Sequence, residues 1–261
     1  MKIRLHSWGG LGSQLFALAV VSEIKRKMPN RNIEIIHHTS GVTKRFFELE
    51  SMLNSKSVLK TIDDYKVPDN QLRKSSVKFI KRFLICSIKL ILNKTRISVN
   101  LDDTPELNRL KPWTFEIRGH YSKRQIENTF LEECIRFFNS SDADTEDLSQ
   151  SLTVHYRLGD LLTIKEKTFI APSRLMSCIA EIKENYLLKR VVIYSDSMVE
   201  ARIKLEKLNN MFSLINFIDA PTKKVIKNSI NSLYFLGTNS KVSFWIVKLR
   251  NYLGMPSQIM D

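Results

Sequence analysis

The chain has 261 residues, of which 43% are hydrophobic and 26% are charged. This length and composition suffice for one large domain or for two of about 130 residues, and they exclude global disorder and low complexity. Lys and Arg number 41 against 27 Asp and Glu, a formal net charge of +14. Such an excess favours acidic partners: nucleic acid, anionic lipid or phosphorylated substrates.

Apolar strands alternate with helices along the first half of the chain, and this alternation predicts a parallel sheet. A polar break at residues 62–70 separates the first elements from a basic segment. The predicted elements in chain order are a strand at 2–6, a helix at 14–28, a strand at 33–37, a partly helical stretch at 43–60, a basic helix within 73–96, a strand at 115–118 and a helix at 123–139.

An acidic stretch of small residues at 140–147 is the predicted linker between a lobe of residues 1–145 and a lobe of residues 150–261. The predicted elements of the second lobe are strands at 151–156, 190–194, 212–217 and 233–237 and helices at 172–185, 198–207, 223–231 and 241–252. The predicted fold class is therefore α/β, with two Rossmann-like lobes.

A glycine-rich turn joins the first predicted strand to the first predicted helix. Gly9, Gly10 and Gly12 occupy this turn. Backbone N–H groups between a strand and a helix N-terminus can face an anion or a sugar. The spacing fits neither the dinucleotide-binding nor the P-loop fingerprint, so an ordinary tight turn remains the alternative.

Three polar turns follow three apolar strands in the second lobe, and all should lie at the carboxyl edge of one sheet, where open α/β sheets bind ligands. They contain His155, Arg157 and Asp160; Ser195, Asp196 and Ser197; and Asn239, Ser240 and Ser243. The planar guanidinium of Arg157 suits a diphosphate, because it can hold two phosphate oxygens at once.

Each of these turns also has a simpler interpretation. The serines near 195 and 240 are typical helix N-caps, and Arg157 with Asp160 could form a surface ion pair. We favour a ligand site because three such turns fall on one edge.

The three cysteines, Cys86, Cys134 and Cys178, are far apart and show no metal-ligand spacing. They are expected to be reduced thiols of a cytosolic protein. No stretch of about 18 uninterrupted apolar residues is present, so no transmembrane helix is expected.

The basic segment within 73–96 has a helical pattern with one apolar and one cationic face. Phe79, Phe83, Cys86 and Leu90 share the first face, and Lys78, Lys81, Arg82 and Lys89 gather on the second. The cations of the whole segment are Arg73, Lys74, Lys78, Lys81, Arg82, Lys89, Lys94 and Arg96. The pattern favours binding to an anionic membrane surface, and the alternative is a core helix with a solvated basic face. Nucleic acid is disfavoured, because the aromatic residues do not lie among the cations.

Four motifs together resemble those of bacterial α-1,2-fucosyltransferases, spanning residues 9–245 in the same order. Their sequences are Gly-Gly-Leu-Gly-Ser-Gln-Leu-Phe at 9–16, His-Tyr-Arg-Leu-Gly-Asp at 155–160, Tyr-Ser-Asp-Ser at 194–197 and Asn-Ser-Lys-Val-Ser-Phe-Trp at 239–245. Residues 118–122 resemble a further motif weakly. The His-x-Arg-x-x-Asp element is shared with α-1,6- and protein O-fucosyltransferases.

This resemblance implies a two-lobed GT-B architecture, a GDP-sugar donor on the C-terminal lobe, an inverting mechanism and no required metal or other cofactor. It assigns Arg157 to the donor β-phosphate, His155 to shaping that site and Asp196 to the nucleoside. The predicted catalytic residues are Arg157, Ser13 and His155. The predicted nucleotide-sugar contacts are Gly10, Gly12, Gln14, Arg157, Asp160, Ser195, Asp196, Asn239, Ser240 and Ser243.

The chain departs from the family pattern at several positions. Leu158 replaces a second arginine, Ser13 replaces an asparagine and Ile246 replaces a tryptophan. These changes are typical of a divergent branch, which can use another donor sugar. No general base stands out, and the candidates are His6, Asp160 and Glu166.

We therefore expect a glycosyltransferase that moves a sugar from GDP-fucose or a related nucleotide-sugar to a cell-surface polysaccharide intermediate, such as an O-antigen or capsule precursor. The expected acceptor is a glycan or lipid-linked glycan at the cytoplasmic face of the membrane, and nucleic acid is not an expected partner. The alternatives are an inert nucleotide-sugar-binding protein of the same fold and a basic nucleic-acid-binding protein.

Overall fold

The computed structural model describes residues 2–39, 44–53, 57–64, 91–92, 95, 97–102, 107, 110–140, 147–162, 169–210, 212 and 214–261. The basic segment within 73–96 lies outside these residues, except for positions 91, 92 and 95, and Glu166 also lies outside them. The amphipathic-helix hypothesis therefore stays a prediction.

The chain divides into two compact units, Met1–Phe130 and Leu131–Asp261. The division falls within the helix α3 (Asn128–Asn139), upstream of the predicted linker at 140–147. Residues 131–139 of α3 belong to unit 2, where Asn231 donates to the Asn139 amide oxygen at 3.2 Å and the Lys223 ammonium lies 4.1 Å from the ring centre of Phe137.

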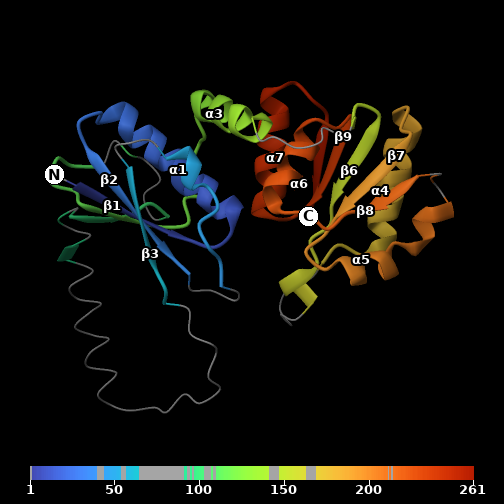
Figure 1. Cartoon of the computed structure of the whole chain (residues 1–261), viewed down its shortest axis with the longest axis horizontal. Coiled ribbons are helices and arrows are strands. Elements are labelled where there is room, and N and C mark those ends of the chain that lie inside the picture. The colour runs from blue at the N-terminus through green and yellow to red at the C-terminus, as the bar shows by residue number, and fades with distance from the viewer. Residues whose placement is uncertain are drawn as a thin grey trace, which may run out of the picture. The chain divides into compact units, whose positions relative to one another are not determined.

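Unit 1 contains a five-stranded parallel sheet in the order β3-β2-β1-β5-β4 (Figure 1). The elements of this unit are β1 (Lys2–Trp8), α1 (Leu11–Lys27), β2 (Asn32–His38), η1 (Glu50–Met52), β3 (Ser57–Ile62), β4 (Ser98–Asn100) and β5 (Glu116–Arg118). On β1, Ile3 and Leu5 are buried in the apolar core, whereas Arg4, His6 and Trp8 alternate with them on the other face. The two faces of this sheet therefore differ in polarity.

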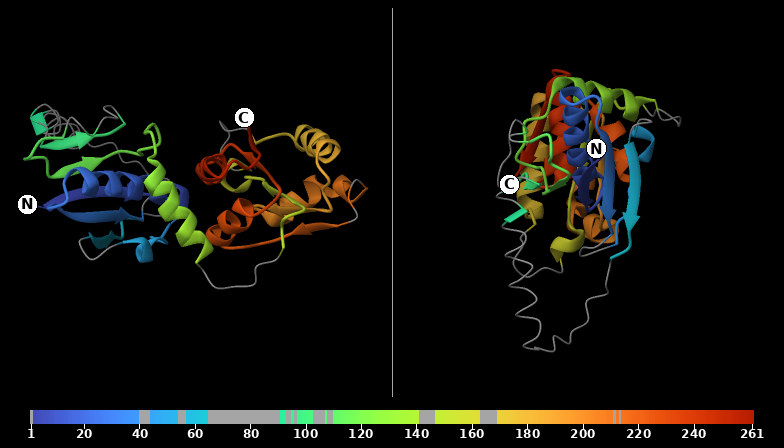
Figure 2. Two further views of the ribbon diagram at one scale, coloured as in Figure 1. Left: turned by 90° about the horizontal axis from the view of Figure 1, so that it is seen from above. Right: turned by 90° about the vertical axis from the view of Figure 1, so that its left-hand side faces the viewer.

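Unit 2 contains a second five-stranded parallel sheet in the order β10-β9-β6-β7-β8, and both sheets have helices beside them (Figure 2). Its elements are β6 (Ser151–His155), η3 (Gly159–Leu162), α4 (Pro172–Asn185), β7 (Arg190–Tyr194), α5 (Met198–Lys204), η4 (Glu206–Asn210), β8 (Ile215–Phe217), α6 (Thr222–Ile230), β9 (Tyr234–Thr238), α7 (Lys241–Tyr252) and β10 (Ser257–Met260). The chain starts at the central β6, adds β7 and β8 on one side, and returns to add β9 and β10 on the other. The strand order reverses between β6 and β9, which makes this the topological switch point.

The core of unit 2 is built from continuous apolar strands, as expected for a parallel sheet covered on both faces. Leu152, Val154, Val191, Ile193 and Leu236 are all fully buried there. The predicted α/β fold with two Rossmann-like lobes is confirmed.

Some predicted elements differ from the structure. The stretch at 43–60, which was expected to be partly helical, contains the short 3₁₀ helix η1, but it also contains most of β3, which was not predicted. The short strands β4 and β10 were not predicted, and α3 begins at Asn128 rather than at 123.

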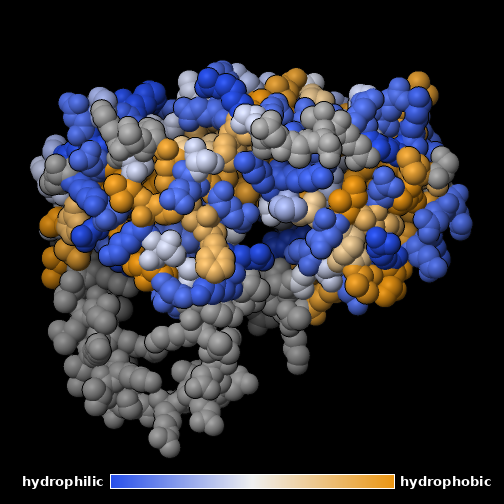
Figure 3. Space-filling view, in the orientation of Figure 1, coloured by the Kyte–Doolittle hydropathy of each residue, from blue (hydrophilic) through white to orange (hydrophobic). Residues whose placement is uncertain are grey.

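The visible surface mixes hydrophilic with hydrophobic residues over both units (Figure 3). Of the helices within the described residues, none combines the length and the apolar character that crossing a membrane requires.

Candidate functional site

The turn after β6 is fixed to the end of β9 at the switch point of unit 2. The backbone N–H of Arg157 donates to Thr238 Oγ1 at 2.9 Å, and Thr238 Oγ1 donates to the carbonyl oxygen of His155 at 3.2 Å. The Arg157 side chain is half-buried at this edge. Parallel sheets of this topology bind ligands outside the carboxyl ends of the strands at the switch point, so Arg157 lies where a ligand is expected.

His155 contacts the start of helix α7 through a chain of hydroxyl groups. Ser240 caps α7 by accepting from the Ser243 N–H at 2.9 Å, and its hydroxyl donates to Ser243 Oγ at 3.0 Å. Ser243 Oγ lies 2.8 Å from His155 Nδ1. If each hydroxyl donates onward, Nδ1 is an acceptor and the His155 proton resides on Nε2, where it can be donated.

Gly237 permits this close approach of α7 to β9. A Cβ atom at position 237 would lie 2.6 Å from Ser243 Cβ, which is closer than two non-bonded carbon atoms can approach. The structure thus brings the predicted residues His155, Ser240 and Ser243 together. Ser243 is fully buried, whereas Ser240 is half-buried and Asn239 is exposed.

Burial lowers the pKa of His155 to about 4. The negative charge of Asp196 opposes this shift, and the positive charge of Arg157 adds to it. The imidazole is therefore neutral at neutral pH, and Arg157 is the cation of this turn.

This lowered pKa predicts a pH-dependent stability of unit 2. Between the ordinary value of 6.5 and about 4, unfolded chains bind more protons at His155 than folded chains do, so stability falls as the pH is lowered through this range. The loss reaches about 3 kcal/mol at pH 4. Urea denaturation at several pH values should show that His155→Gln removes this part of the slope. His120→Gln, at an exposed histidine of unit 1, should leave it unchanged.

Asp196 organises the turn that carries Arg157. Its Oδ1 atom accepts from the backbone N–H groups of Leu158 and Gly159, both at 2.8 Å. A Cβ atom at position 159 would lie 2.3 Å from Asp196 Oδ2, so this contact requires glycine. The carboxylate predicted to meet the nucleoside therefore also fixes the local backbone. Ser195 accepts from the Ser197 N–H at 3.1 Å, and Asp160 lies within η3.

Leu158, at the position of the second family arginine, belongs to the apolar core of unit 2 and is fully buried. Ile246, at the position of the family tryptophan, is likewise fully buried. Both departures from the family pattern thus fall on core positions.

The glycine-rich turn of unit 1 has the expected strand–turn–helix geometry. Gly9 has φ +81°, a conformation that favours glycine, and Gly10 is the N-cap of α1. Ser13 is half-buried, and a Cβ at Gly9 would lie 3.1 Å from its Oγ. Gly12 is buried.

Gln14 has a structural role in this turn. Its side chain is fully buried, and its amide nitrogen donates to the carbonyl oxygens of Gly9 at 3.1 Å and Phe46 at 2.7 Å. Its amide oxygen accepts from the Glu48 N–H at 2.7 Å. The side chain therefore holds residues 46–48 against the turn.

Sequence reasoning missed Thr238, whose hydroxyl links β6 to β9, and His38, which contacts His6 at 2.8 Å. The position of Thr238 at the end of a predicted strand was the available signal. His38 gave no such signal, because its partners lie on β1 and directly after β3, far from it in the sequence.

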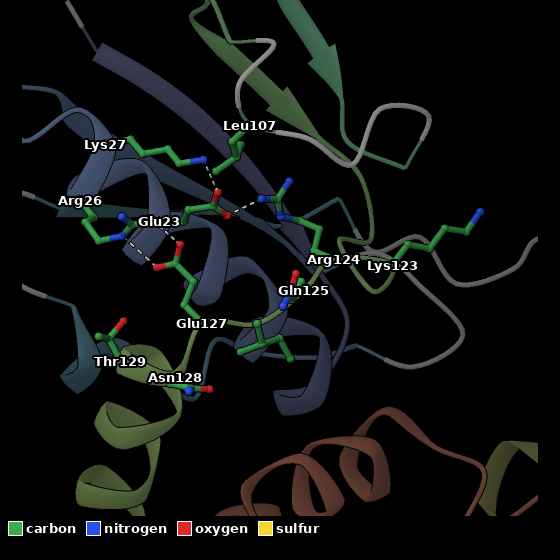
Figure 4. Close-up of a pocket in the computed structure, with 11 residues that line it drawn as sticks. Glu23, Arg26, Lys27, Leu107, Lys123, Arg124, Gln125, Glu127, Asn128 and Thr129 are labelled. Carbon is green, nitrogen blue, oxygen red and sulfur yellow. Dashed lines mark hydrogen bonds and ion pairs between the residues drawn. The ribbon is translucent and has the colours of Figure 1, made fainter. Parts of the chain in front are cut away.

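A pocket of about 710 Å³ lies elsewhere in unit 1, near the C-terminal end of α1 (Figure 4). Its carboxylates are paired: Glu23 with Lys27 and Arg124, and Glu127 with Arg26. None of the predicted site residues lines it. Among the described residues, no cluster of three or more His, Cys, Asp or Glu side chains could hold a metal ion.

No family model and no curated protein matches the sequence. Among solved structures, the chain is similar to the Escherichia coli heptosyltransferase WaaC with ADP-2-deoxy-2-fluoro heptose, with a TM-score of 0.50 and 8% identity over 99% of this chain and 88% of that chain. POFUT1 in complex with GDP matches with a TM-score of 0.49 and 12% identity over 99% and 98% of the two chains. A family 9 glycosyl transferase from Veillonella parvula matches with a TM-score of 0.46 and 10% identity over 99% and 80%.

The likeness to the heptosyltransferase concerns the fold. Both units of this chain are Rossmann-like, and the fold is that of the GT-B glycosyltransferases. Fold alone does not assign an activity, which has to be argued from the site.

Proposed function

We propose that this chain is an inverting, metal-independent glycosyltransferase of the fucosyltransferase type. It takes a sugar from GDP-fucose or a related GDP-sugar and transfers it to a hydroxyl group of a glycan or lipid-linked glycan. The observation that carries the proposal is the switch-point site of unit 2, where Arg157, His155 and the start of α7 lie on one sheet edge.

This site is suited to a leaving diphosphate. Breaking the sugar–phosphate bond leaves negative charge on phosphate oxygens, and fixed donors aimed at that charge stabilise the transition state. Arg157 supplies a forked cation, His155 supplies a neutral Nε2–H donor, and the α7 N-terminus supplies backbone dipoles. Together they can provide the electrostatic stabilisation that a metal ion supplies in other enzymes.

We propose different roles for the predicted contacts. Ser240 is half-buried at the α7 N-terminus, which suits a phosphate contact. Ser243 is buried beneath it and orients His155. Asp196 holds the turn at Leu158 and Gly159, and any nucleoside contact would be additional.

A panel of nucleotide-sugars tests this proposal directly. GDP-sugars should raise the melting temperature of the purified chain, since a ligand at 100 times its Kd adds about 2.7 kcal/mol of stability. The UDP- and ADP-sugars serve as matched controls for the base. No shift with any nucleotide-sugar would contradict the proposal.

A chelator tests the absence of a metal requirement. With a responsive donor and a glycan acceptor, release of nucleoside diphosphate should persist in excess EDTA. A strict need for Mn²⁺ or Mg²⁺ would mean that the phosphates are bound in another way. Donor binding without any release of nucleoside diphosphate would instead favour the inert sugar-nucleotide-binding protein.

We also propose a role in cell-surface polysaccharide synthesis, at the cytoplasmic face of the membrane. The support for this part is the cationic, apolar pattern of the segment within 73–96. Salt-sensitive binding of DNA or RNA would favour the nucleic-acid-binding alternative.

A further inference from the structure

One face of the unit 1 sheet carries a stack of polar and aromatic rings. His6 and Trp8 share a face of β1, and His38 lies opposite Trp8 on β2. The rings of His38 and Trp8 are 4.8 Å apart and nearly parallel, and those of His6 and His38 are 5.1 Å apart. Parallel sheets usually cover both faces with apolar residues, so this polar face needs an explanation.

Four side chains on this face form a continuous line of hydrogen bonds. Asp64 Oδ2 lies 2.7 Å from His38 Nδ1, and His38 Nε2 lies 2.8 Å from His6 Nδ1. His6 Nε2 lies 3.1 Å from Glu116 Oε1. The line thus has a carboxylate at each end and two imidazoles between them.

The number of protons in this line follows from the contacts. Each of the three contacts requires one proton between its two heavy atoms. Three protons shared by two carboxylates and two imidazoles give the line a net charge of −1, whichever atoms carry them. When both carboxyl groups are ionised, the two histidines together hold one positive charge between them.

The groups around the line are consistent with this count. The hydrogen bond from His6 is the main reason that the pKa of Glu116 lies well below its usual range, and Arg118 lowers it further. Arg118 donates to Glu116 Oε1 at 2.8 Å. Of the other charged side chains on this face, Lys2 and Arg4 pair with Glu34 at 2.7 and 3.2 Å, and the exposed Lys60 lies on β3 opposite Ile36.

The two ends of the line differ in access to solvent. The side chains of His6 and His38 are 7% and 13% exposed, and that of Glu116 is 18% exposed. Asp64 is 36% exposed and follows the end of β3, at the carboxyl edge of the sheet. Protons can therefore exchange most readily at Asp64.

We propose that Asp64, His38, His6 and Glu116 form one hydrogen-bonded relay, in which His38, His6 and Glu116 position Asp64 and Asp64 accepts the proton of a hydroxyl-bearing ligand at the carboxyl edge of unit 1. The identification of that ligand as the sugar acceptor rests on the proposed function. In the transfer step, the acceptor oxygen bonds to the anomeric carbon and the sugar–phosphate bond breaks, with its electron pair going to the diphosphate. The hydroxyl proton goes to Asp64, while His38, His6 and Glu116 hold that carboxylate in position.

Kinetics of the full chain test the role of Asp64. Asp64→Asn should lower the turnover number for transfer by about 10²–10⁴-fold, the usual contribution of a general base. The melting-temperature shift with the donor should be unchanged, because donor binding is assigned to unit 2. The matched control is Asp63→Asn, since Asp63 also follows β3 but pairs with Thr39 and Lys44. His6→Gln, at a positioning residue, should shift the acid limb of the pH–rate profile and not merely scale it.

Nitrogen-15 NMR of histidine-labelled protein tests the relay without any ligand. Three protons on the four ring nitrogens of His6 and His38 are expected, and Asp64→Asn should perturb the Nδ1 resonance of His38. Two neutral rings in the folded protein would overturn the relay, and wild-type transfer by Asp64→Asn would overturn the role of Asp64. If no donor binds and no transfer occurs, the proposed function and the acceptor role both fail. The NMR result then shows by itself whether the relay is present in the folded protein.

Discussion

Replacing Arg157 with lysine should lower the turnover number by about 10²–10³-fold, the usual effect of losing one donor to a developing anion. Residues 151–162 contain no other Lys or Arg, so no neighbouring cation of this turn can substitute for it. His155 is neutral at working pH and cannot supply the missing charge. An ammonium keeps the charge of Arg157 but loses the fork that binds two oxygens at once.

The Arg157 result is measured as release of nucleoside diphosphate under saturating donor. Arg174→Lys is the matched control, because Arg174 lies on α4 of the same unit and donates to the backbone oxygen of Asp261 at 2.6 Å. Its turnover should match the wild type. Near-normal turnover in a folded Arg157→Ala variant would contradict the assignment of the donor site.

The fold was largely predictable because its strands and helices follow strong local patterns. The helices at 172–185 and 241–252 and the strand at 190–194 have the predicted bounds. The spacing of their own apolar residues and the polar turns that flank them determine where these elements begin and end. In contrast, β4 and β10 have only three and four residues, and they are strands because a parallel neighbour completes their hydrogen bonds. No local pattern encodes such a pairing.

The sequence was sufficient to predict at which sheet edge the residues of the candidate site lie. The sequence placed His155, Asp196 and Ser240 after strands, and the topology brings those strand ends to one edge. Their individual contacts were not predictable, because the burial of Ser243 and the packing of Leu158 depend on how closely α7 and the core approach. The hydrogen-bonded line from Asp64 to Glu116 could not be predicted either, because its members lie on or directly after four different strands.

Replacing Arg250 with methionine should destabilise unit 2 by about 3 kcal/mol or more, because each hydrogen bond to a charged group contributes about 1.5–3 kcal/mol. Arg250 is fully buried on α7, and burial lowers its pKa to about 10, so it remains charged at neutral pH. Its guanidinium donates to backbone carbonyl oxygens of Ser229, Ile230, Ser232, Leu233 and Pro256.

Methionine approximates the volume of the Arg250 stem but leaves these carbonyl groups without their donors, and each buried unsatisfied group costs about 1–3 kcal/mol. Urea denaturation can isolate unit 2, because Trp245 on α7 reports it once Trp8 and Trp113 of unit 1 are replaced by phenylalanine. Arg174→Met, at an exposed arginine of α4, should change stability by less than about 0.5 kcal/mol. A similarly small change in Arg250→Met would mean that water replaces the guanidinium and that the turns around α7 hold without it.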